Sequence, residues 1–441
     1  MYSQIPTIFS EKISPEAREK IAQCKDFVER YCIPADKIYL EQISPDREKR
    51  WKEVPEIIGK LKIEARKRGL WNMFLSNKYS EGAGYTNLEY GCMAEHLGRS
   101  IVAPSVTNNN APDTGNMEIL ARYGTKSQKE KWLNPLLDGA IRSAFLMTEK
   151  GTSSSNALNI SCSAKLNSRG KYVINGVKWF ASGSGDPNCA VWLVMCKTDS
   201  SKSTPYANHT VLLIDSKRAL ASGKAKLVRP LTVFGYDEAP HGHCEIVFED
   251  YEVTDADNSE IILHKLGGGF EVIQSRLGPG RIHHCMRTIG VAEQALLTVA
   301  HRANNRLIFG TRMSERESFK TAYSQYKIDV EKCRILVLNA AHTIDVKGPK
   351  GAMREIAMAK IEVPRKVLQI LDWCIQMFGA EGVSQDTPLA RAYAETRTLR
   401  IADGPDEAHL GQLARNNAKD FPKIEKYFEE LEQSRLDVAK L

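Results

Sequence analysis

The feature that most constrains the fold is a change of hydrophobic periodicity that divides the 441-residue chain into three parts. From about Pro15 to Ser143, and again after Gly267–Gly269, apolar residues recur every three to four positions, which is typical of amphipathic helices. Between these parts, from about Phe145, the period changes to two, which indicates β-strands. Helices, then strands, then helices, with no internal repeat, favour an α+β protein over a doubly wound sheet.

Four local patterns predict how individual elements begin, end or turn. The first helical run is expected to end at Pro34, because proline removes a hydrogen-bond donor from a helix. The dipeptide Asn175-Gly176, between two strand-like runs, predicts a hairpin turn. Pro364 is expected to kink or restart the last long helix. The segment Arg276–Arg281 (RLGPGR) is expected to open a long helix, where its arginines suit phosphate binding or form a solvated basic face.

Composition and charge exclude several classes of protein. Hydrophobic residues make up 42% and charged residues 26% of the chain, which is typical of a globular protein and not of a disordered one. The net charge of +7 is spread along the chain, without a basic tract for a nucleic acid or a membrane surface. It suits an anionic small substrate at least as well. No apolar run reaches the roughly 18 residues of a membrane span, and the N-terminus lacks the apolar stretch of a secretory signal.

Metal and nicotinamide sites lack their sequence signatures. The ten cysteines include no C-x-x-C pair, so we expect buried, reduced thiols rather than a zinc site or a redox dithiol. His283 and His284 would point about 100° apart on one helix, which disfavours joint metal ligation. No G-x-G-x-x-G follows a strand, so a nicotinamide enzyme of the usual kind is not predicted.

Four segments carry residues suited to binding or catalysis, and each also has an ordinary structural interpretation. Phe145–Glu149 with Ser153–Asn156 suits a polar cofactor or forms a solvated loop. Lys178–Gly183 offers aromatic rings to a planar ring system or contributes them to the core. The arginine-rich start of the long helix is the third segment. Ile401–Glu407 is an acidic cluster, or the first turn of a helix whose dipole the acids complement.

The order and spacing of these segments carry more information than any one of them. The strings that matter are Ala111–Leu120 (APDTGNMEIL), Gly124–Leu136, Met147–Glu149 (MTE), Lys178-Trp179, Ser182–Pro187, Arg276–Arg281 and Ala402–Glu407 (ADGPDE). With them the chain resembles the acyl-CoA dehydrogenase superfamily from about residue 15 to residue 418. The resemblance is closest to the branch of acyl-CoA dehydrogenase family members 10 and 11.

This resemblance implies the acyl-CoA dehydrogenase fold. The expected parts are an N-terminal helical domain at residues 1–143, a middle β-barrel-like domain at 144–258 and a C-terminal four-helix bundle at 259–418. A C-terminal extension at 419–441 follows them.

The resemblance also implies FAD as the cofactor and assigns roles to individual residues. The residues matched to FAD-binding positions are Phe145, Met147, Thr148, Phe180, Ser182, Arg306, Phe309, Gln376, Gly379, Pro405 and Glu407. Within this set Arg306, Phe309, Gln376 and Gly379 match residues that a neighbouring subunit supplies, so a homodimer or homotetramer is expected. Ser155, Arg281 and Gly404 match positions that face the acyl-CoA substrate. Asp403 matches the catalytic carboxylate, which most relatives supply as Glu.

The implied reaction is the α,β-dehydrogenation of a fatty acyl-CoA to a trans-2-enoyl-CoA in β-oxidation. A base removes the α-proton while a hydride passes from the β-carbon to the flavin, and the electrons continue to an electron-transfer flavoprotein or to oxygen. Aspartate is one methylene shorter than glutamate, which moves the carboxylate by ~1.5 Å and affects the approach to the substrate. Lys150, Asn156 and Phe180 also depart from the usual Pro, Asp and Trp of the family.

Three other functions remain open at this stage. One is an oxidase that passes electrons to oxygen, and another is an inactive CoA-binding scaffold, which the departures from the family pattern would explain. The third is a DNA-binding superfamily member, which needs a basic C-terminal region. The segment after Ala418 mixes both charges, which disfavours DNA binding.

The last three residues, Ala439-Lys440-Leu441, resemble the S-K-L peroxisomal address. The N-terminus carries Glu11 and Glu16 and has no Arg-rich amphipathic stretch, which disfavours a mitochondrial leader. We therefore expect a peroxisomal location.

Overall fold

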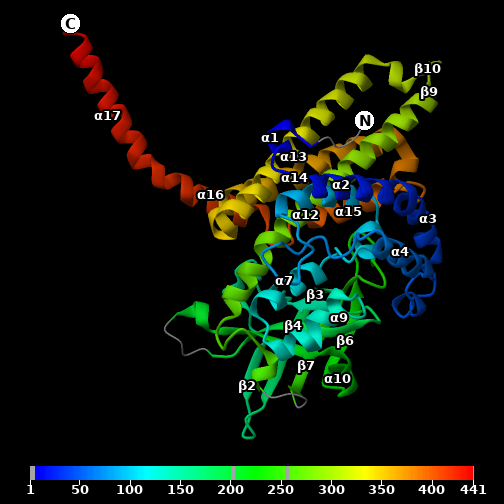
Figure 1. The fold of residues 1–441 in the computed structure, drawn as a ribbon, viewed down its shortest axis with the longest axis vertical. Coiled ribbons are helices and arrows are strands. Elements are labelled where there is room, and N and C mark those ends of the chain that lie inside the picture. The colour runs from blue at the N-terminus through cyan, green and yellow to red at the C-terminus, as the bar shows by residue number, and fades with distance from the viewer. Residues whose placement is uncertain (1–4, 200–203, 254–257, 441) are drawn as a thin grey trace.

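A computed structural model describes residues 5–199, 204–253 and 258–440, with helices at one end of the molecule and the β-sheet at the other (Figure 1). The N-terminal elements are α1 (Thr7–Ser10), α2 (Pro15–Phe27), the π-helix η1 (Val28–Cys32), α3 (Ile33–Gln42), the 3-10 helix η2 (Lys49–Trp51), α4 (Glu56–Lys67), α5 (Asn87–Leu97), α6 (Ala103–Val106), α7 (Asp113–Tyr123), α8 (Lys126–Gln128), the π-helix η3 (Lys129–Leu133) and α9 (Asn134–Leu137).

The middle and C-terminal elements follow in the same order as the sequence predicts. The middle elements are β1 (Arg142–Leu146), η4 (Ala157–Asn159), β2 (Ser163–Leu166), β3 (Tyr172–Ser182), β4 (Cys189–Lys197), η5 (Pro205–Ala207), β5 (His209–Asp215), α10 (Ser216–Ala221), β6 (Ala225–Leu231), β7 (His243–Glu252), α11 (Asn258–Ile261) and β8 (Ile262–Leu263). The C-terminal elements are α12 (Gly269–Asn305), β9 (Leu307–Ile308), β10 (Thr311–Arg312), η6 (Met313–Glu315), α13 (Glu317–Gly351), α14 (Met353–Phe378), η7 (Gly379–Val383), α15 (Leu389–Thr398), α16 (Asp406–Asn417), η8 (Ala418–Asp420) and α17 (Phe421–Val438).

The main sheet has the strand order β6-β7-β3-β2-β4-β5-β8, and β1 pairs with β4 beside this path. Alternating side chains of β4 belong to two different cores. Val191, Leu193 and Met195 join the core of the helical body, whereas Trp192 and Val194 join the core on the other face of the sheet. This alternation attaches the sheet to the helices through one of its faces. The first strand, β1, begins inside the predicted N-terminal part, and β8 lies inside the predicted C-terminal part, because both pair with strands of the sheet.

The predicted hairpin at Asn175-Gly176 is wrong, since β3 runs through both residues as one strand. The strand contains a bulge between Ile174 and Gly176 where it pairs with β7. Gly176 has φ 145°, and a Cβ there would lie 2.8 Å from the Cα of Cys162. The Asn175 side chain bonds across the bulge to Asp250 Oδ1 at 3.0 Å. The dipeptide therefore serves a β-bulge and a close packing contact rather than a turn.

One predicted helix end and one predicted helix start are also wrong. The chain does not leave the helix at Pro34, because the π-helix η1 connects α2 to α3 and places Pro34 in the first turn of α3, where a missing N–H is tolerated. The segment Arg276–Arg281 lies inside α12, which begins at Gly269, so no helix start is available to it. The last long helix, α14, continues through Pro364 without restarting.

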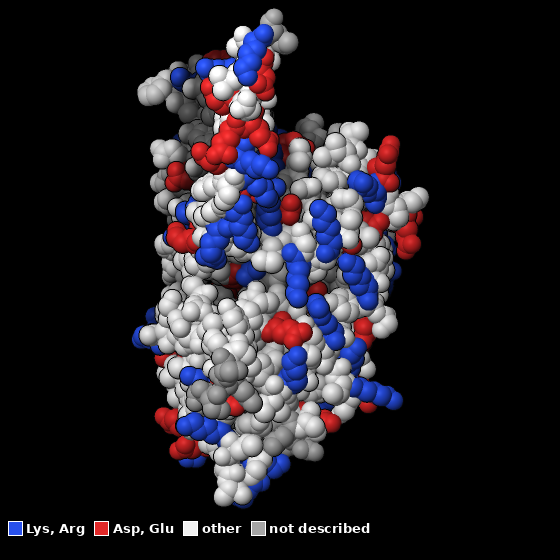
Figure 2. All heavy atoms as spheres, turned by 90° about the vertical axis from the view of Figure 1, so that its left-hand side faces the viewer, with Lys and Arg blue, Asp and Glu red and all other residues white. Residues whose placement is uncertain are grey.

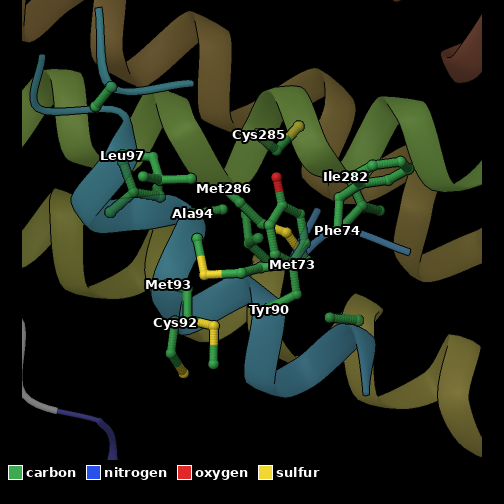
Figure 3. Close-up of a cluster of buried hydrophobic side chains, with 14 of the residues drawn as sticks. Met73, Phe74, Tyr90, Cys92, Met93, Ala94, Leu97, Ile282, Cys285 and Met286 are labelled. Carbon is green, nitrogen blue, oxygen red and sulfur yellow. The ribbon is translucent and has the colours of Figure 1, made fainter. Parts of the chain in front are cut away.

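The helical core is centred on α5, which packs against α12 and α13. Figure 3 shows Tyr90 and Met93 of α5 beside Ile282 and Met286 of α12. The two helices approach closely at Gly290, where a Cβ would lie 1.9 Å from the carbonyl oxygen of Glu95. Glycine at this crossing therefore sets the distance between the N-terminal helices and the bundle.

The last helix, α17, projects away from the body of the protein (Figure 1). None of its residues is buried, and its exposed apolar side chains are Phe421, Ile424, Tyr427, Phe428, Leu431, Leu436 and Val438. The predicted peroxisomal tripeptide begins directly after α17, and its Leu441 lies outside the described residues. All ten cysteines are buried, as the sequence predicts, and that their thiols are reduced stays a prediction.

Candidate active site

A cavity of about 410 Å³ lies where the three parts of the chain meet. Its walls include Pro112 from the N-terminal part, Ser182 and His243 from the sheet, His284 from α12, and Asp403 from the turn before α16. Residues more than 290 positions apart in the sequence thus share one cavity, whose lining is rich in hydroxyl, imidazole and guanidinium groups.

Asp403 is held on this cavity by an unusual backbone. Its φ is 56°, and that of the following Gly404 is 103°, so two consecutive residues lie in the left-handed region. Arg281 of α12 donates from Nε to the carbonyl oxygen of Asp403 at 2.8 Å. On the same helix, His284 Nε2 lies 3.5 Å from Asp403 Oδ2. The long helix therefore fixes both the backbone and the carboxylate of Asp403.

The charges around Asp403 favour its ionised form. Burial by itself would raise the pKa of Asp403, but the surrounding basic side chains, chiefly His284, Arg276 and Arg281, lower it below its usual value. Burial also lowers the pKa of His284 to about 4, so the imidazole is neutral near pH 7. A carboxylate beside a neutral imidazole is ready to accept a proton in the free protein.

The other two acids of the cluster have structural roles. Asp406 Oδ2 accepts hydrogen bonds from Nε of Arg365 and of Arg400, both at 2.8 Å, and the residue is buried. Asp406 and the exposed Glu407 form the first turn of α16, and Pro405 is its N-cap residue. The ordinary interpretation, in which acids complement a helix dipole, is correct for these two acids. Only Asp403 of the three acids lines the cavity.

A buried ion pair joins two of the sequence motifs. Lys178 Nζ lies 2.8 Å from Glu149 Oε1, and both side chains are almost fully inaccessible to solvent. The same ammonium donates to the carbonyl oxygen of Met147 at 3.1 Å, and Trp179 N donates to that of Thr148 at 2.8 Å. The Met147–Glu149 segment and β3 are thus one rigid unit beside the cavity.

Aromatic and hydroxyl groups lie next to this unit. Ser182 Oγ lies 2.8 Å from His243 Nδ1, and the ring of Phe180, whose φ is 51°, lies 5.3 Å from the His243 ring. The Arg276 guanidinium lies 4.3 Å from the ring centroid of Phe145. Trp179 Nε1 is buried without a hydrogen-bond partner among the described residues. This edge of the sheet therefore combines flat apolar rings with donors that a ligand could satisfy.

A second cavity, of about 620 Å³, brings together the other predicted cofactor residues. Arg306, Phe309, Gln376 and Gly379 all line it, and Phe309 is 97% exposed. Its walls also include two arginines, Arg302 and Arg316, whose Nε atoms are buried and have no hydrogen-bond partner among the described residues. This cavity lies beside β9 and β10, at the end of the molecule opposite the sheet (Figure 1).

The predicted site residues thus fall into separate places. Asp403 and Ser182 line the first cavity, and Arg281 contacts the backbone of Asp403. Phe145, Met147, Thr148 and Phe180 lie in or directly after the strands β1 and β3, which end near the cavity. Gly404 is half-buried, and a Cβ there would lie 3.0 Å from His409 Nε2. Ser155 is exposed in the loop that follows Glu149.

Sequence reasoning missed two residues that line the cavity and one that lies behind the Asp403 turn. His284 and His243 were not assigned to it, and Lys360 of α14 was not singled out at all. A signal for His284 existed, because it lies three positions after Arg281 and so on the same face of a helix. His243 and Lys360 reach the site through tertiary packing and left no comparable pattern in the sequence.

Among the described residues, no helix has the length and apolar character needed to cross a membrane. No three His, Cys, Asp or Glu side chains of the described residues lie close enough to share a metal ion.

Comparison with known proteins shows one family over most of the chain. Family models described as acyl-CoA dehydrogenase, N-terminal domain, middle domain and C-terminal domain match residues 14–140, 144–251 and 267–417, respectively. A curated relative, the probable acyl-CoA dehydrogenase FadE2 of Mycobacterium tuberculosis, is 45% identical over 362 residues, which cover 82% of this chain and 85% of that protein.

Two further similarities extend this comparison. Acyl-CoA dehydrogenase family member 11 of Gallus gallus is 44% identical over 405 residues, which cover 91% of this chain and 50% of that protein. The chain therefore spans about half the length of this curated relative. The solved structure of a putative acyl-CoA dehydrogenase from Mycobacterium abscessus has a TM-score of 0.86 and 38% identity, and the match covers 93% of this chain and 99% of that one.

Proposed function

Because the chain belongs to the acyl-CoA dehydrogenase family, we propose that it is an FAD-dependent oxidoreductase that dehydrogenates the α,β carbon–carbon bond of an acyl-CoA. The observation that carries this proposal is the ionised carboxylate of Asp403, held over a cavity that the sheet edge with Ser182 and His243 completes. The substrate must contact a base and a redox cofactor at the same time. This cavity has Asp403 on one wall and the sheet residues Ser182 and His243 on another.

The residues present fit FAD. The rings of Phe145 and Phe180, the Thr148 segment and the Ser182 hydroxyl would hold the flavin half, and the unpartnered Nε1 of Trp179 offers a further donor. The unpartnered Nε atoms of Arg302 and Arg316 suit the diphosphate half, at the cavity that Arg306, Phe309, Gln376 and Gly379 line. FAD, when bound, supplies hydride acceptance.

The two groups of cofactor residues imply an oligomer. The first group lies where the three parts of the chain meet, and the second lies beside β9 and β10 at the end away from the sheet (Figure 1), so a single dinucleotide contacts both when the second group comes from another copy of the chain. A homodimer is the smallest assembly in which each copy completes the site of the other, and a homotetramer would repeat this arrangement.

The chain's own residues perform the proton transfer. Asp403 removes the α-proton of the thioester, and Arg281 holds the backbone from which its side chain extends. A bound acyl group expels water from the cavity, and this desolvation raises the proton affinity of the carboxylate when it is needed. His284, whose Nε2 lies 3.5 Å from Asp403 Oδ2, is neutral near pH 7 and places a polar ring beside the carboxylate without adding a full charge.

Hydrogen bonds to the thioester carbonyl are also required, because its α-proton is too weakly acidic for a free carboxylate. The resemblance assigns one such donor to the backbone N–H of Asp403. A trans-2-enoyl-CoA is then the product, and a fatty acyl-CoA of β-oxidation is the substrate class that we propose. The electrons leave to an electron-transfer flavoprotein or to oxygen.

Surface charge supports an anionic substrate. Figure 2 shows Lys and Arg side chains gathered below the projecting α17 and along one side of the same face. Positive potential of this kind attracts the phosphates of CoA. The peroxisomal location remains a prediction from Ala439-Lys440-Leu441, and the exposure of α17 supports it, because a receptor must reach the tripeptide.

Anaerobic mixing of the FAD-loaded protein with butyryl-CoA, octanoyl-CoA and palmitoyl-CoA tests the proposal. The flavin absorbance should bleach with at least one of them. Asp403→Asn should bind FAD and the acyl-CoA but bleach about 10²–10⁴-fold more slowly, because a positioned base is lost. Glu425→Gln, in the exposed α17, is the matched control and should bleach at the wild-type rate. Bleaching of Asp403→Asn at that rate would disprove the assignment of the base.

A further inference from the structure

A buried lysine lies beneath the turn that carries Asp403. Lys360 extends from α14, and only 1% of its surface is exposed. Its Nζ donates to the carbonyl oxygen of Leu399 and, at 3.4 Å, to that of Gly404. One ammonium group therefore contacts both ends of the segment Leu399–Gly404, and Asp403 is the residue before its last contact.

Burying the ammonium of Lys360 costs desolvation free energy, and no described residue forms a close ion pair with it. Burial lowers the pKa of Lys360, while the charges of Cys285 and Asp403 act in the opposite direction. Among the described residues, no carboxylate oxygen lies within 4.0 Å of its ammonium. The two backbone carbonyls that accept from Lys360 offset part of the cost of burying its charge.

The turn needs such support. Asp403 and Gly404 have φ of 56° and 103°, and a non-glycine residue persists in the left-handed region only where its surroundings over-determine it. Backbone hydrogen bonds run from Ile401 N and Ala402 N to Thr398 O before Asp403, and from Asp406 N to Arg400 O across it. Arg281 holds the Asp403 carbonyl, and Lys360 holds the Gly404 carbonyl next to it.

We propose that Lys360 is a positioning residue, whose buried ammonium clamps the Leu399–Gly404 turn so that the Asp403 carboxylate reaches the cavity. This inference rests on the proposed function, because it concerns the base of that reaction. Lys360 itself touches neither the cavity nor the reacting atoms. Its contribution is the geometry of the base and a positive charge near it.

The charge has a consequence that a purely structural lysine would not have. Charged and titratable groups face Asp403 from three helices, namely Arg276, Arg281 and His284 on α12, Lys360 on α14, and Asp406 and His409 on α16. Lys360 is one of the groups that lower the pKa of Asp403. Removing its charge while the others stay should therefore raise the pKa of the base and move the acid limb of the pH–rate profile to higher pH.

The test compares Lys360→Met with the wild type in the FAD-loaded protein. We expect unchanged FAD content, flavin reduction slowed by about 10²-fold at saturating acyl-CoA, and an acid limb displaced to higher pH. Lys366→Met, on the same helix but partly exposed and away from the turn, should leave rate and profile unchanged. Lys360→Arg keeps the charge and the donors, so its profile should stay at the wild-type position.

Each outcome decides a separate claim. If the wild type is not bleached by any of the three acyl-CoAs, the proposed function fails. If the wild type is bleached and Lys360→Met matches it in rate and in pH profile, the inference on Lys360 is wrong. A slower Lys360→Met with an unshifted profile would also overturn it, because the charge would then have no effect on the base. If Lys360→Met does not retain FAD, Lys360→Gln, which also removes the charge, replaces it with the same criteria.

Discussion

Replacing Lys178 by methionine should destabilise the middle domain by about 3–5 kcal/mol, because it leaves a buried carboxylate without its cation. Lys178 is fully buried, and the Glu149 side chain is 3% exposed, so solvent cannot replace the lost ammonium. Glu149 keeps hydrogen bonds from Ser161 N at 2.8 Å and Cys162 N at 2.9 Å, which holds the loss at the lower end of that range. The carbonyls of Met147 and Met195 lose their donor as well.

The Glu149–Lys178 ion pair determines how the free energy of unfolding changes with pH. Burial would raise the pKa of Glu149, but Lys178 and the surrounding donors lower it below its usual value. A carboxyl group with a depressed pKa stabilises the fold above its unfolded pKa, and this contribution is lost as pH falls through the folded pKa. In Lys178→Met the Glu149 carboxyl binds a proton and so loses its unpaired charge. The difference in the free energy of unfolding between the variant and the wild type should therefore be largest near about pH 7 and shrink towards about pH 4.

Urea denaturation followed by tryptophan fluorescence and circular dichroism measures this difference. Lys226→Met is the matched control, because Lys226 also forms an ion pair in the sheet, with Glu249 at 2.6 Å, but both side chains are more than half exposed. Its removal should change stability by less than about 1 kcal/mol. The double variant Glu149→Gln with Lys178→Met should recover part of the loss. Equal effects of Lys178→Met and Lys226→Met, or an effect of Lys178→Met that does not depend on pH, would refute the reasoning.

Three further predictions concern the cofactor, the helix crossing and the C-terminal helix. Arg306→Ala should weaken FAD retention without dissociating the oligomer, as absorbance after gel filtration would show, and full retention would count against the cross-subunit site. Gly290→Ala should destabilise the protein by about 1–3 kcal/mol or more, because its Cβ would lie 1.9 Å from a backbone oxygen, and an unchanged melting temperature would contradict the close crossing. Deleting residues 421–441 should leave the melting temperature of the body unchanged, since no residue of α17 is buried. In cells that deletion should turn a punctate N-terminal fluorescent fusion diffuse, and a fusion of the full chain that is already diffuse would remove the peroxisomal prediction.

The sequence by itself determined the order of the three parts and the family. Both depend on local information, since a period of 3.6 or 2 is set by which face of an element is buried, and strings such as Ala111–Leu120 and Ala402–Glu407 can be read without any knowledge of contacts. The start of α5 is also fixed by local residues. Thr86 and Glu89 form a capping box at the start of α5.

The predicted hairpin at Asn175-Gly176 and the predicted helix end at Pro34 were wrong because they relied on local preference alone. Asn175-Gly176 has the composition of a turn, but its glycine is required by the Cα of Cys162 and its asparagine by Asp250 on another strand. Pro34 would end an isolated helix, yet a π-helix absorbs it within the packed N-terminal domain. At Asn175-Gly176 contacts with distant residues thus outweighed the local preference, whereas Pro34 is tolerated because it lies in the first turn of α3.

Tertiary contacts also distinguish the proposed base from the other acids near it. The sequence offers Asp403, Asp406 and Glu407 as near neighbours with similar chemistry, and only the resemblance separated them. In the structure Arg365 and Arg400 form ion pairs with Asp406. Arg281 and His284 of α12 and Lys360 of α14 instead hold the turn and the carboxylate of Asp403 and surround it with basic groups. Apart from Arg400, which is 6 positions from Asp406, these residues lie 41 to 122 positions from their partners, and no periodicity or local motif encodes such contacts, because they exist only when the helices have packed.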